Sequence, residues 1–233
     1  MKNNSKNKNP AVVLLSGGMD SATCLAKAKD EGFSVYALSF QYGQRHGIEL
    51  EMAKHQARNL SAKEHKILNL DFAPIAPSSL TGVGQVPKDE LPEGIPNTYV
   101  PGRNMVFLSL GVAWAEVLGA SHLFVGVNQV DYSGYPDCRG EFIEAFERMA
   151  NLATRAGVEG RKLHIRTPLL DLDKPGIIRL GLSLGVDYSK TLTCYDPTKE
   201  GKSCGRCPSC LLRLKAFDEL GMEDPAPYVK KSK

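Results

Sequence analysis

The chain has 233 residues, 42% of them hydrophobic, which suits one large domain or a domain with a small appendage. No apolar run approaches the ~20 residues of a membrane helix, and residues 1–10 lack the apolar core of a secretory signal, so we expect a disordered tail and a cytoplasmic protein with no membrane partner. The net charge is +3, but Lys2, Lys6 and Lys8 lie in that tail and the remainder carries 26 basic and 26 acidic residues, which argues against broad nucleic-acid binding.

Predicted strands and helices alternate along the chain. This alternation predicts an α/β fold with a doubly wound, mostly parallel sheet covered on both faces. Ligands of such sheets bind at the carboxyl ends of the strands. The predicted strands are 11–15, 33–40, 66–70, 122–127 and 163–166, and the predicted helices are 22–30, 47–60, 104–118, 141–156 and 174–184.

Residues 71–101 differ in kind from the rest of the chain. Several glycines and six prolines exclude a regular element there. An irregular segment of this length inside a compact domain is usually functional or mobile. The prolines are Pro74, Pro77, Pro87, Pro92, Pro96 and Pro101.

The stretch Ser16-Gly17-Gly18-Met19-Asp20-Ser21 follows the first predicted strand and precedes the first predicted helix. Two glycines let the backbone approach a ligand, and the free amide N–H groups of a helix N-terminus attract anions. The stretch has neither the Walker pattern G-x-x-x-x-G-K-[ST] nor the dinucleotide pattern G-x-G-x-x-G. It predicts a phosphate or pyrophosphate site. The alternative, a Ser-capped helix start, does not require two glycines.

Four of the six cysteines lie near the C-terminus in the pattern C-x₉-C-x₂-C-x₂-C. Four thiolates without histidine, in a glycine-containing segment, fit a closed structural zinc site. Disulfides are disfavoured without a secretory signal, and a redox pair requires a different helix context. An iron–sulfur cluster is the main alternative. The predicted zinc ligands are Cys194, Cys204, Cys207 and Cys210.

Polar clusters follow two of the predicted strands and precede one predicted helix, where the rim of a binding site is expected. Arg45 and Arg103 offer planar guanidinium groups for phosphate or carboxylate. Asp131 and Asp137 offer acceptors for ring N–H or amino groups, or ligands for Mg²⁺, and Tyr135 offers an aromatic face. The same stretches are also good turn sequences. Three clusters at one sheet edge nevertheless predict a binding site.

These motifs carry a resemblance to known families. Residues 16–21 resemble the SGGxDS loop of the PP-loop ATP pyrophosphatases, which cleave ATP between the α- and β-phosphates and adenylylate an acceptor. Narrower matches are "IPNTYVPGRN" at 95–104, "SGYPDC" at 133–138 and "TLTCY" at 191–195. With residues 40–46 and the four cysteines, they are similar to the 7-cyano-7-deazaguanine synthases of queuosine precursor biosynthesis, over nearly the whole chain.

The resemblance implies an adenine nucleotide alpha hydrolase-like fold, with a PP-loop nucleotide-binding domain at 11–190 and a small helical zinc-binding segment at 191–233. It implies a carbon–nitrogen ligase that converts 7-carboxy-7-deazaguanine and ammonia to 7-cyano-7-deazaguanine through adenylylated intermediates, releasing AMP and pyrophosphate. ATP with Mg²⁺ is then a substrate, zinc is a structural ion with one bound per chain, and the chain forms a homodimer.

The same resemblance implies roles for individual residues. We expect Asp20, Arg103 and Lys174 to be catalytic, with Asp20 orienting the loop or holding Mg²⁺ and the two cations stabilising the triphosphate. Cys24 and Cys138 are expected to be packed thiols. The residues expected to contact the deazaguanine substrate are Arg45, Asp131, Tyr135 and Asp137. The residues expected to bind ATP are Leu15, Ser16, Gly17, Gly18, Met19, Asp20, Ser21, Ala22, Thr23, Cys24 and Leu25.

Two other classes of function stay open at this point. A PP-loop enzyme that thiolates tRNA usually needs a catalytic cysteine pair or a separate RNA-binding domain, and the neutral body weighs against it. A zinc-stabilised nucleotide-binding module without turnover is separated from an enzyme by an assay for pyrophosphate release.

Overall fold

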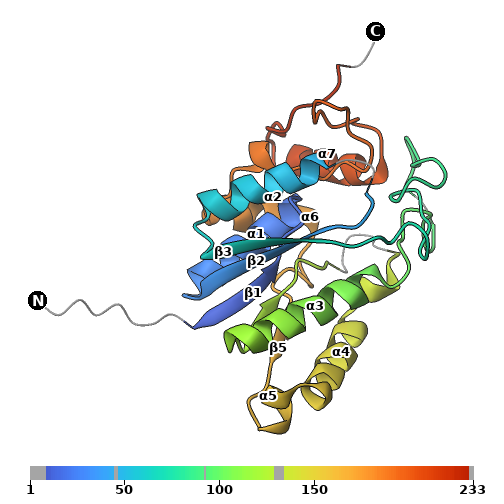
Figure 1. Cartoon of the computed structure of the whole chain (residues 1–233). Coiled ribbons are helices and arrows are strands. Elements are labelled where there is room, and N and C mark those ends of the chain that lie inside the picture. The colour runs from blue at the N-terminus through green and yellow to red at the C-terminus, as the bar shows by residue number, and fades with distance from the viewer. Residues whose placement is uncertain (1–8, 45–46, 92, 129–133, 231–233) are drawn as a thin grey trace, which may run out of the picture.

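The computed structural model describes residues 9–44, 47–91, 93–128 and 134–230, and it confirms the predicted α/β fold (Figure 1). Five strands pair in parallel in the order β3-β2-β1-β4-β5. The order reverses between β1 and β4, and such a switch point is where open α/β sheets bind ligands. The strands are β1 (Pro10–Leu14), β2 (Ser34–Gln41), β3 (Glu64–Asn69), β4 (His122–Phe124) and β5 (His164–Arg166).

Helices cover both faces of the sheet because successive side chains of a strand point to opposite sides. On β1, Val12 and Leu14 pack towards α3 (Arg103–Leu118) and α4 (Gly140–Ala153). Ala11 and Val13 pack on the other face, towards three helices. Those helices are α1 (Met19–Asp30), α2 (Ile48–Asn59) and α6 (Lys174–Ser183).

Most boundaries lie within one or two residues of the predictions, and three differences are larger. The predicted helix 141–156 is divided, because Thr154 is extended and its hydroxyl accepts a hydrogen bond from the Gly157 amide at 3.2 Å, opening the short helix α5 (Arg155–Val158). Helix α1 begins at Met19, before the predicted start at residue 22, because Gly18 is its N-cap. Strand β4 ends three residues before the predicted end at 127.

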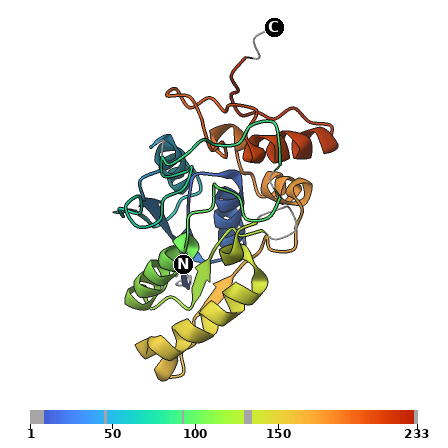
Figure 2. The same cartoon turned by 90° about the vertical axis from the view of Figure 1, so that its right-hand side faces the viewer.

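The C-terminal part of the chain lies beside the sheet rather than in it and contains α7 (Pro208–Glu219), which packs on α6 (Figures 1 and 2). Its centre is a buried ion pair between Arg213 and Asp224, with Nε to Oδ2 at 2.7 Å and Nη2 to Oδ1 at 2.8 Å. Arg213 also donates to the hydroxyls of Thr191 and Thr193. A buried charge pair of this kind is retained only with such complete hydrogen bonding.

The proline-rich segment 71–101 contains no helix or strand in its described residues, as predicted. It is nevertheless attached to the C-terminal segment. Val86 is buried against Cys194 and its neighbouring cysteines, and the Lys88 ammonium lies 2.7 Å from Asp196 Oδ2. The Asp89 carboxylate accepts from the Arg206 guanidinium. The two regions therefore form one wall at the carboxyl end of the sheet.

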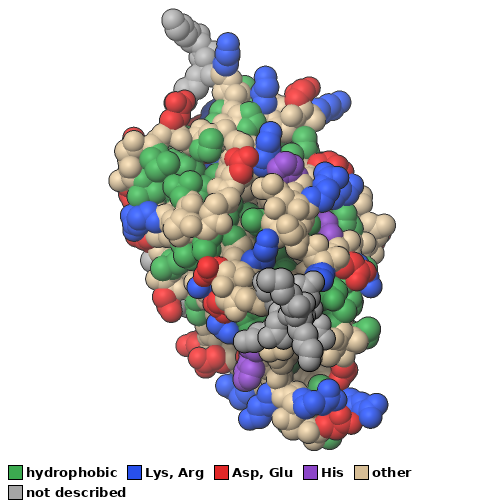
Figure 3. Space-filling model, turned by 90° about the vertical axis from the view of Figure 1, so that its left-hand side faces the viewer, with side chains coloured by type: hydrophobic (Ala, Val, Ile, Leu, Met, Phe, Trp, Pro, Cys, Tyr) green, Lys and Arg blue, Asp and Glu red, His purple; other side chains and the backbone are tan. Residues whose placement is uncertain are grey.

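The helices and the surface agree with two expectations from the sequence, the lack of a membrane helix and the balance of basic and acidic residues. Among the described residues, none of the helices has both the length and the hydropathy of a membrane span. The side of the molecule that faces left in Figure 1 carries Lys and Arg side chains intermixed with Asp and Glu (Figure 3).

Candidate active site

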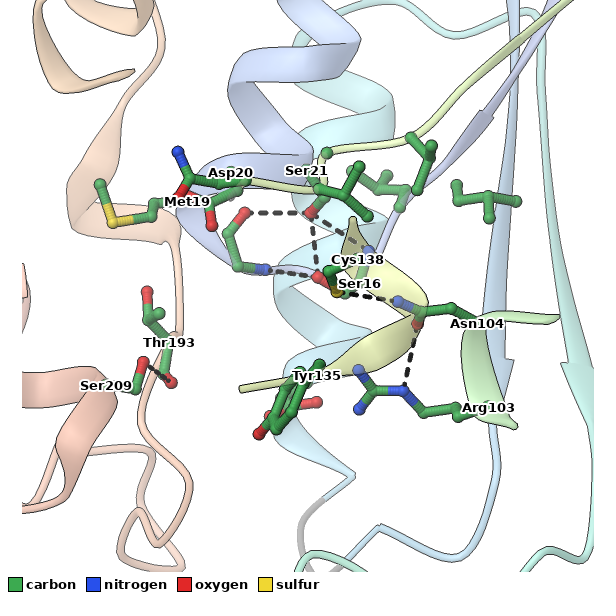
Figure 4. A pocket seen from close by; sticks show the side chains of 18 of the residues that line it. Ser16, Met19, Asp20, Ser21, Arg103, Asn104, Tyr135, Cys138, Thr193 and Ser209 are labelled. Carbon is green, nitrogen blue, oxygen red and sulfur yellow. Dashed lines mark hydrogen bonds between the residues drawn. The ribbon is translucent and has the colours of Figure 1, made fainter. Parts of the chain in front are cut away.

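A cavity of about 310 Å³ opens at the carboxyl ends of β1, β2 and β4, the position that the topology favours. Its lining combines the residue 16–21 loop, the start of α3 and part of the C-terminal segment. Figure 4 shows Thr193 and Ser209 on one side and Arg103 and Asn104 on the other, with Ser16 and Asp20 between them.

The residue 16–21 loop is held by hydrogen bonds of its own. The Ser21 hydroxyl accepts from the Ser16 amide at 3.2 Å, lies 3.0 Å from the Ser16 hydroxyl and donates to the Gly18 carbonyl at 3.0 Å. The Gly18 amide donates to the Ser16 hydroxyl at 3.2 Å, and within the described residues no side-chain hydrogen bond caps the following amides of the first turn of α1. These amides are therefore free to bind an anion, as at other helix N-termini.

Two glycines allow the loop to pack where it does. Gly17 has φ of +96°, and a Cβ there would lie 2.1 Å from the Glu49 carbonyl oxygen of α2. Gly126, just after β4, would place a Cβ 3.0 Å from the Asp20 backbone. The Gly17 carbonyl accepts from the Gln56 side chain at 2.9 Å and from the Leu192 amide at 3.0 Å. The loop is thus fixed by α2, by the β4 end and by the C-terminal segment.

Asp20 and Lys174 form an ion pair in the cavity, with Nζ to Oδ2 at 2.8 Å. The other oxygen, Asp20 Oδ1, is buried and has no hydrogen-bond partner in the described part of the chain. A buried carboxylate oxygen without a partner is costly, so it fits a cation or another ligand group that the site receives. Lys174 opens α6 despite the following proline, because the Asp173 side chain caps that helix and Pro175 stands in its first turn.

Arg103 provides the second cation of the cavity. Its guanidinium donates to the Tyr42 hydroxyl at 3.3 Å and lies over the Tyr42 ring. Burial alone would lower the pKa of Arg103, but the nearby Tyr42, Tyr135, Cys138 and Asp137 raise it overall, so the group stays charged. The Tyr135 hydroxyl is 2.8 Å from Thr98 Oγ1. Aromatic rings beside a fixed cation suit a planar, anionic ligand.

Glu49, which is not among the residues predicted from the sequence, lines the same cavity. It stands in the first turn of α2, and burial raises the pKa of its carboxyl to about 7 even though Arg103 opposes the shift. An acidic residue in the first turn of a helix looks like an ordinary solvated charge. The only signal was its position shortly after the polar cluster at 40–46.

The C-terminal segment supplies polar groups that were also missed as individual site residues. Thr193, Tyr195 and Ser209 line the cavity, together with Leu192. The Ser209 hydroxyl donates to the Thr193 carbonyl at 2.8 Å. The available signal in the sequence is that these residues lie next to the cysteines, but a four-cysteine pattern indicates a structural role and does not by itself point to a cavity.

Of the residues expected to contact the deazaguanine substrate, Tyr135 lines the cavity. Arg45 and Asp131 lie outside the described residues. Asp137 is not among the lining residues; its Oδ2 accepts from the Asn104 amide at 3.0 Å and so caps the first turn of α3. Its pKa is raised by burial, with that amide and Arg103 opposing. Asp137 therefore orients the helix that carries Arg103.

The residues expected to bind ATP fall into two groups. Six line the cavity, and the other five are buried in the protein beneath it. Cys24 is fully buried, as expected, and Cys138 is buried with its sulfur accepting from Asn104 Nδ2 at 3.2 Å. The lining residues are Leu15, Ser16, Gly18, Met19, Asp20 and Ser21, and the others are Gly17, Ala22, Thr23, Cys24 and Leu25.

The four C-terminal cysteines converge, with their sulfur atoms all within 4.8 Å of one another. Tetrahedral zinc with Zn–S bonds of ~2.3 Å needs sulfur atoms about 3.8 Å apart, so the set fits a metal after small adjustments. Backbone amides donate to these sulfurs, including Cys204 N to Cys194 Sγ at 3.2 Å and Cys207 N to Cys204 Sγ at 3.3 Å. Such donors stabilise thiolate charge.

Comparisons with known proteins give matches over nearly the whole chain. The sequence model of the family described as "Queuosine biosynthesis protein QueC" matches residues 10–221. Relatives named 7-cyano-7-deazaguanine synthase from Desulfatibacillum aliphaticivorans and Paramagnetospirillum magneticum are each 60% identical; the alignments cover 97% and 94% of this chain and 99% and 98% of the relatives.

A solved structure, described as a predicted subunit of tRNA methyltransferase from Methanocaldococcus jannaschii, covers 96% of this chain and 94% of its own. Its TM-score is 0.50 at 17% identity, so the likeness concerns the fold alone. The family match and the two relatives extend over nearly the full chain and include both the loop and the cysteines. The chain therefore belongs to the QueC family of queuosine biosynthesis proteins.

Proposed function

We propose that this chain is an ATP-dependent carbon–nitrogen ligase that converts 7-carboxy-7-deazaguanine and ammonia to 7-cyano-7-deazaguanine. Family membership supports the product, because the relatives carry the name of that synthase. The observation that carries the reaction type is the cavity in which an uncapped helix start, a half-buried carboxylate with one buried oxygen, and two cations converge. These groups suit the activation of a carboxylate by ATP.

Activation is needed because a carboxylate oxygen is a poor leaving group. In the proposed first half, a substrate oxygen attacks the α-phosphorus of ATP, pyrophosphate leaves, and ammonia then displaces AMP to give the amide. In the second half, the amide oxygen is adenylylated, and loss of AMP leaves the nitrile. The protein's contribution is to hold the reactants in line and to stabilise phosphate charge.

The loop amides and Ser16 and Ser21 hydroxyls would hold the pyrophosphate part of ATP. The unpartnered Asp20 Oδ1 supports a role as a ligand of the Mg²⁺ that accompanies ATP, and Lys174 and Arg103 would balance the phosphate charge. The Tyr42 and Tyr135 rings flank the space beside Arg103, which suits the planar deazaguanine.

We also propose that the four-cysteine site holds one structural zinc ion. The convergence of four sulfurs without histidine or an open position supports zinc in a closed tetrahedral site. Bound there, the ion would fix residues 194–210 and the cavity wall that adjoins them. The division into a nucleotide-binding domain at 11–190 and a zinc-binding segment at 191–233 belongs to the same proposal.

We further propose that the chain acts in the cytoplasm, where ATP is supplied, and forms a homodimer. Exposed apolar side chains on the outer sides of α3 and α4 support contact with a second copy through these helices. Sedimentation velocity of the chain and of a Leu152→Glu variant tests this, with the variant expected to sediment as a monomer. The apolar side chains are Met105, Val106, Val117, Met149 and Leu152.

The experiment that tests the reaction is mass-spectrometric product analysis with 7-carboxy-7-deazaguanine, ammonium and Mg-ATP. The expected result is the nitrile, with two AMP and two pyrophosphate released for each product. Binding of ATP without AMP release would instead indicate a nucleotide-binding module. AMP release that depends on tRNA rather than on the deazaguanine acid would indicate an RNA-modifying enzyme.

A further inference from the structure

The proposed reaction places a demand on the cavity that its phosphate-binding groups do not meet. Ammonia carries three N–H bonds and a nitrile nitrogen carries none, so three protons must leave one nitrogen atom. One leaves when the amide forms and two leave when the adenylylated amide becomes the nitrile. Asp20 is paired with Lys174, and its free oxygen is assigned to the metal of ATP. A different proton acceptor is therefore required.

Glu49 is the other carboxylate that lines the cavity among the described residues. Its position is fixed, because it stands in the first turn of α2 and its backbone carbonyl is in contact with Gly17 of the loop. Within the described part of the chain, no hydrogen bond or ion pair occupies its carboxylate. Glu51 lies two residues further along α2 and differs from Glu49. Its side chain is exposed, and its Oε1 lies 2.7 Å from the Lys54 ammonium.

We propose that Glu49 is the catalytic base that accepts protons from the reacting nitrogen, an inference that rests on the proposed function. In amide formation, the nitrogen lone pair forms the C–N bond, the C–O bond to AMP breaks with its electron pair on the phosphate, and a nitrogen proton passes to the Glu49 carboxylate. In nitrile formation, the carboxylate first takes one N–H proton of the adenylylated amide, which leaves a neutral O-adenylyl imidate. It then takes the second N–H proton, and the electron pair of that N–H bond forms the third carbon–nitrogen bond as the C–O bond to AMP breaks. Between transfers the carboxyl returns its proton to water.

The electrostatic setting agrees with this role. Burial raises the pKa of Glu49 to about 7, and Arg103 from α3 opposes the shift. Tyr42 from the end of β2 also interacts with it, and its own pKa is raised by burial. The remaining titratable lining residues are Asp20, Lys174, Tyr135, Cys138 and Tyr195. A base with a pKa near the working pH is the most effective proton acceptor.

The test uses the full chain and starts from the amide, 7-amido-7-deazaguanine, with Mg-ATP, so that titration of ammonium does not enter. Glu49→Gln is compared with Glu51→Gln, a neutralisation on the same helix outside the cavity. The Glu49→Gln variant is expected to lose about 10²–10⁴-fold in kcat for nitrile formation, with KM changed only a few-fold. Its single-turnover burst of pyrophosphate should persist, because adenylylation does not use this base. The Glu51→Gln variant should match the parent chain.

The pH profile gives a second, independent readout. In the parent chain kcat should fall as pH falls below about 7, because the base becomes protonated, and this limb should be absent from the Glu49→Gln variant. Formate should partly restore nitrile formation in a Glu49→Ala variant. Unchanged kcat in the Glu49→Gln variant, a change confined to KM, or a parent profile without the acid limb would each overturn the inference. Failure of the parent chain to make nitrile would instead overturn the proposed function.

Discussion

At the residue scale, Asp20 gives the clearest indication of a ligand, because its buried Oδ1 has no hydrogen-bond partner among the described residues. Asp20→Asn keeps the size of the side chain but removes the charge that faces Lys174 and weakens the acceptor at the unpartnered Oδ1. We expect adenylylation to fall on the order of 10²-fold or more, as for loss of one preorganised electrostatic group. Pyrophosphate release with the deazaguanine acid measures this.

Asp30→Asn is the matched control, because Asp30 lies at the exposed end of the same helix. It should leave both the rate and the fold unchanged. The Asp20→Asn variant should also keep its circular dichroism spectrum, since the loop is held by backbone contacts. An unaffected rate would remove Asp20 from the catalytic residues.

Glu49 also makes a prediction about stability. Its carboxyl pKa rises from 4.5 to about 7 on folding because of burial, so between these values the folded chain holds a proton that the unfolded chain lacks. The resulting stabilisation is complete below the lower value and is lost as pH rises through the upper one. Glu49→Gln should therefore be more stable than the parent chain by about 1–3 kcal/mol at pH ~8, and nearly equal to it at pH ~4, below the lower pKa value.

Urea unfolding of both chains at the two pH values measures this difference. The same gain at both values would show that packing, rather than ionisation, causes it. A more stable and less active variant would be the usual outcome of removing a charge that function requires.

At the element scale, the residue 16–21 loop packs closely on α2 because Gly17 has no side chain. Gly17→Ala would place a Cβ 2.1 Å from a backbone oxygen of α2 at a φ of +96°. Gly32→Ala is the matched control, with φ of +90° and no atom within 4 Å of the new Cβ. We expect the control to lose about 1 kcal/mol from φ strain alone, and Gly17→Ala to lose several kcal/mol.

Urea unfolding gives the two free energies, and binding of Mg-ATP shows whether the displaced loop still accepts phosphate. Equal losses in the two variants would mean that the loop moves away from α2 without cost. In that case the close packing would not be what holds the loop in place.

The elements themselves were largely predictable, because their apolar periods are clear. What failed were boundaries set by single residues: Thr154 turns its hydroxyl to the next helix, and Gly18 lets α1 begin early. Side chains that serve tertiary contacts were less predictable. The sequence does not distinguish an Asp137 that binds a substrate ring from one that caps α3, because both roles use a carboxylate acceptor. Glu49 has the sequence context of a surface charge, and only the packing of α2 against the loop places it in the cavity.

At the scale of the whole molecule, the four-cysteine cluster and the irregular segment 71–101 pack together as one unit. Val86 packs on the cysteines. Lys88 pairs with Asp196 and Asp89 pairs with Arg206, two residues that lie between cysteines in the sequence. Cys207→Ser should therefore lower bound zinc and also release the segment, because metal binding and folding are coupled. Metal analysis and limited proteolysis, with cleavage sites mapped by mass spectrometry, measure the two effects.

Cys24→Ser is the control, a buried thiol in α1 outside the cluster. It should retain the metal and keep residues 71–101 protected even where it lowers overall stability. Full metal retention in the Cys207→Ser variant would count against the zinc site. Loss of metal with the segment still protected would show that its ion pairs suffice.

The hydrogen bond from the Leu192 amide to the Gly17 carbonyl joins the loop after β1 to the C-terminal segment of the chain. A ribosome makes these residues at different times, so the phosphate loop emerges long before the wall that encloses it. During synthesis the nascent chain would expose an open, solvated loop until the cysteine segment follows. In that order of events, the loop would be enclosed only after residue 192 has been synthesised.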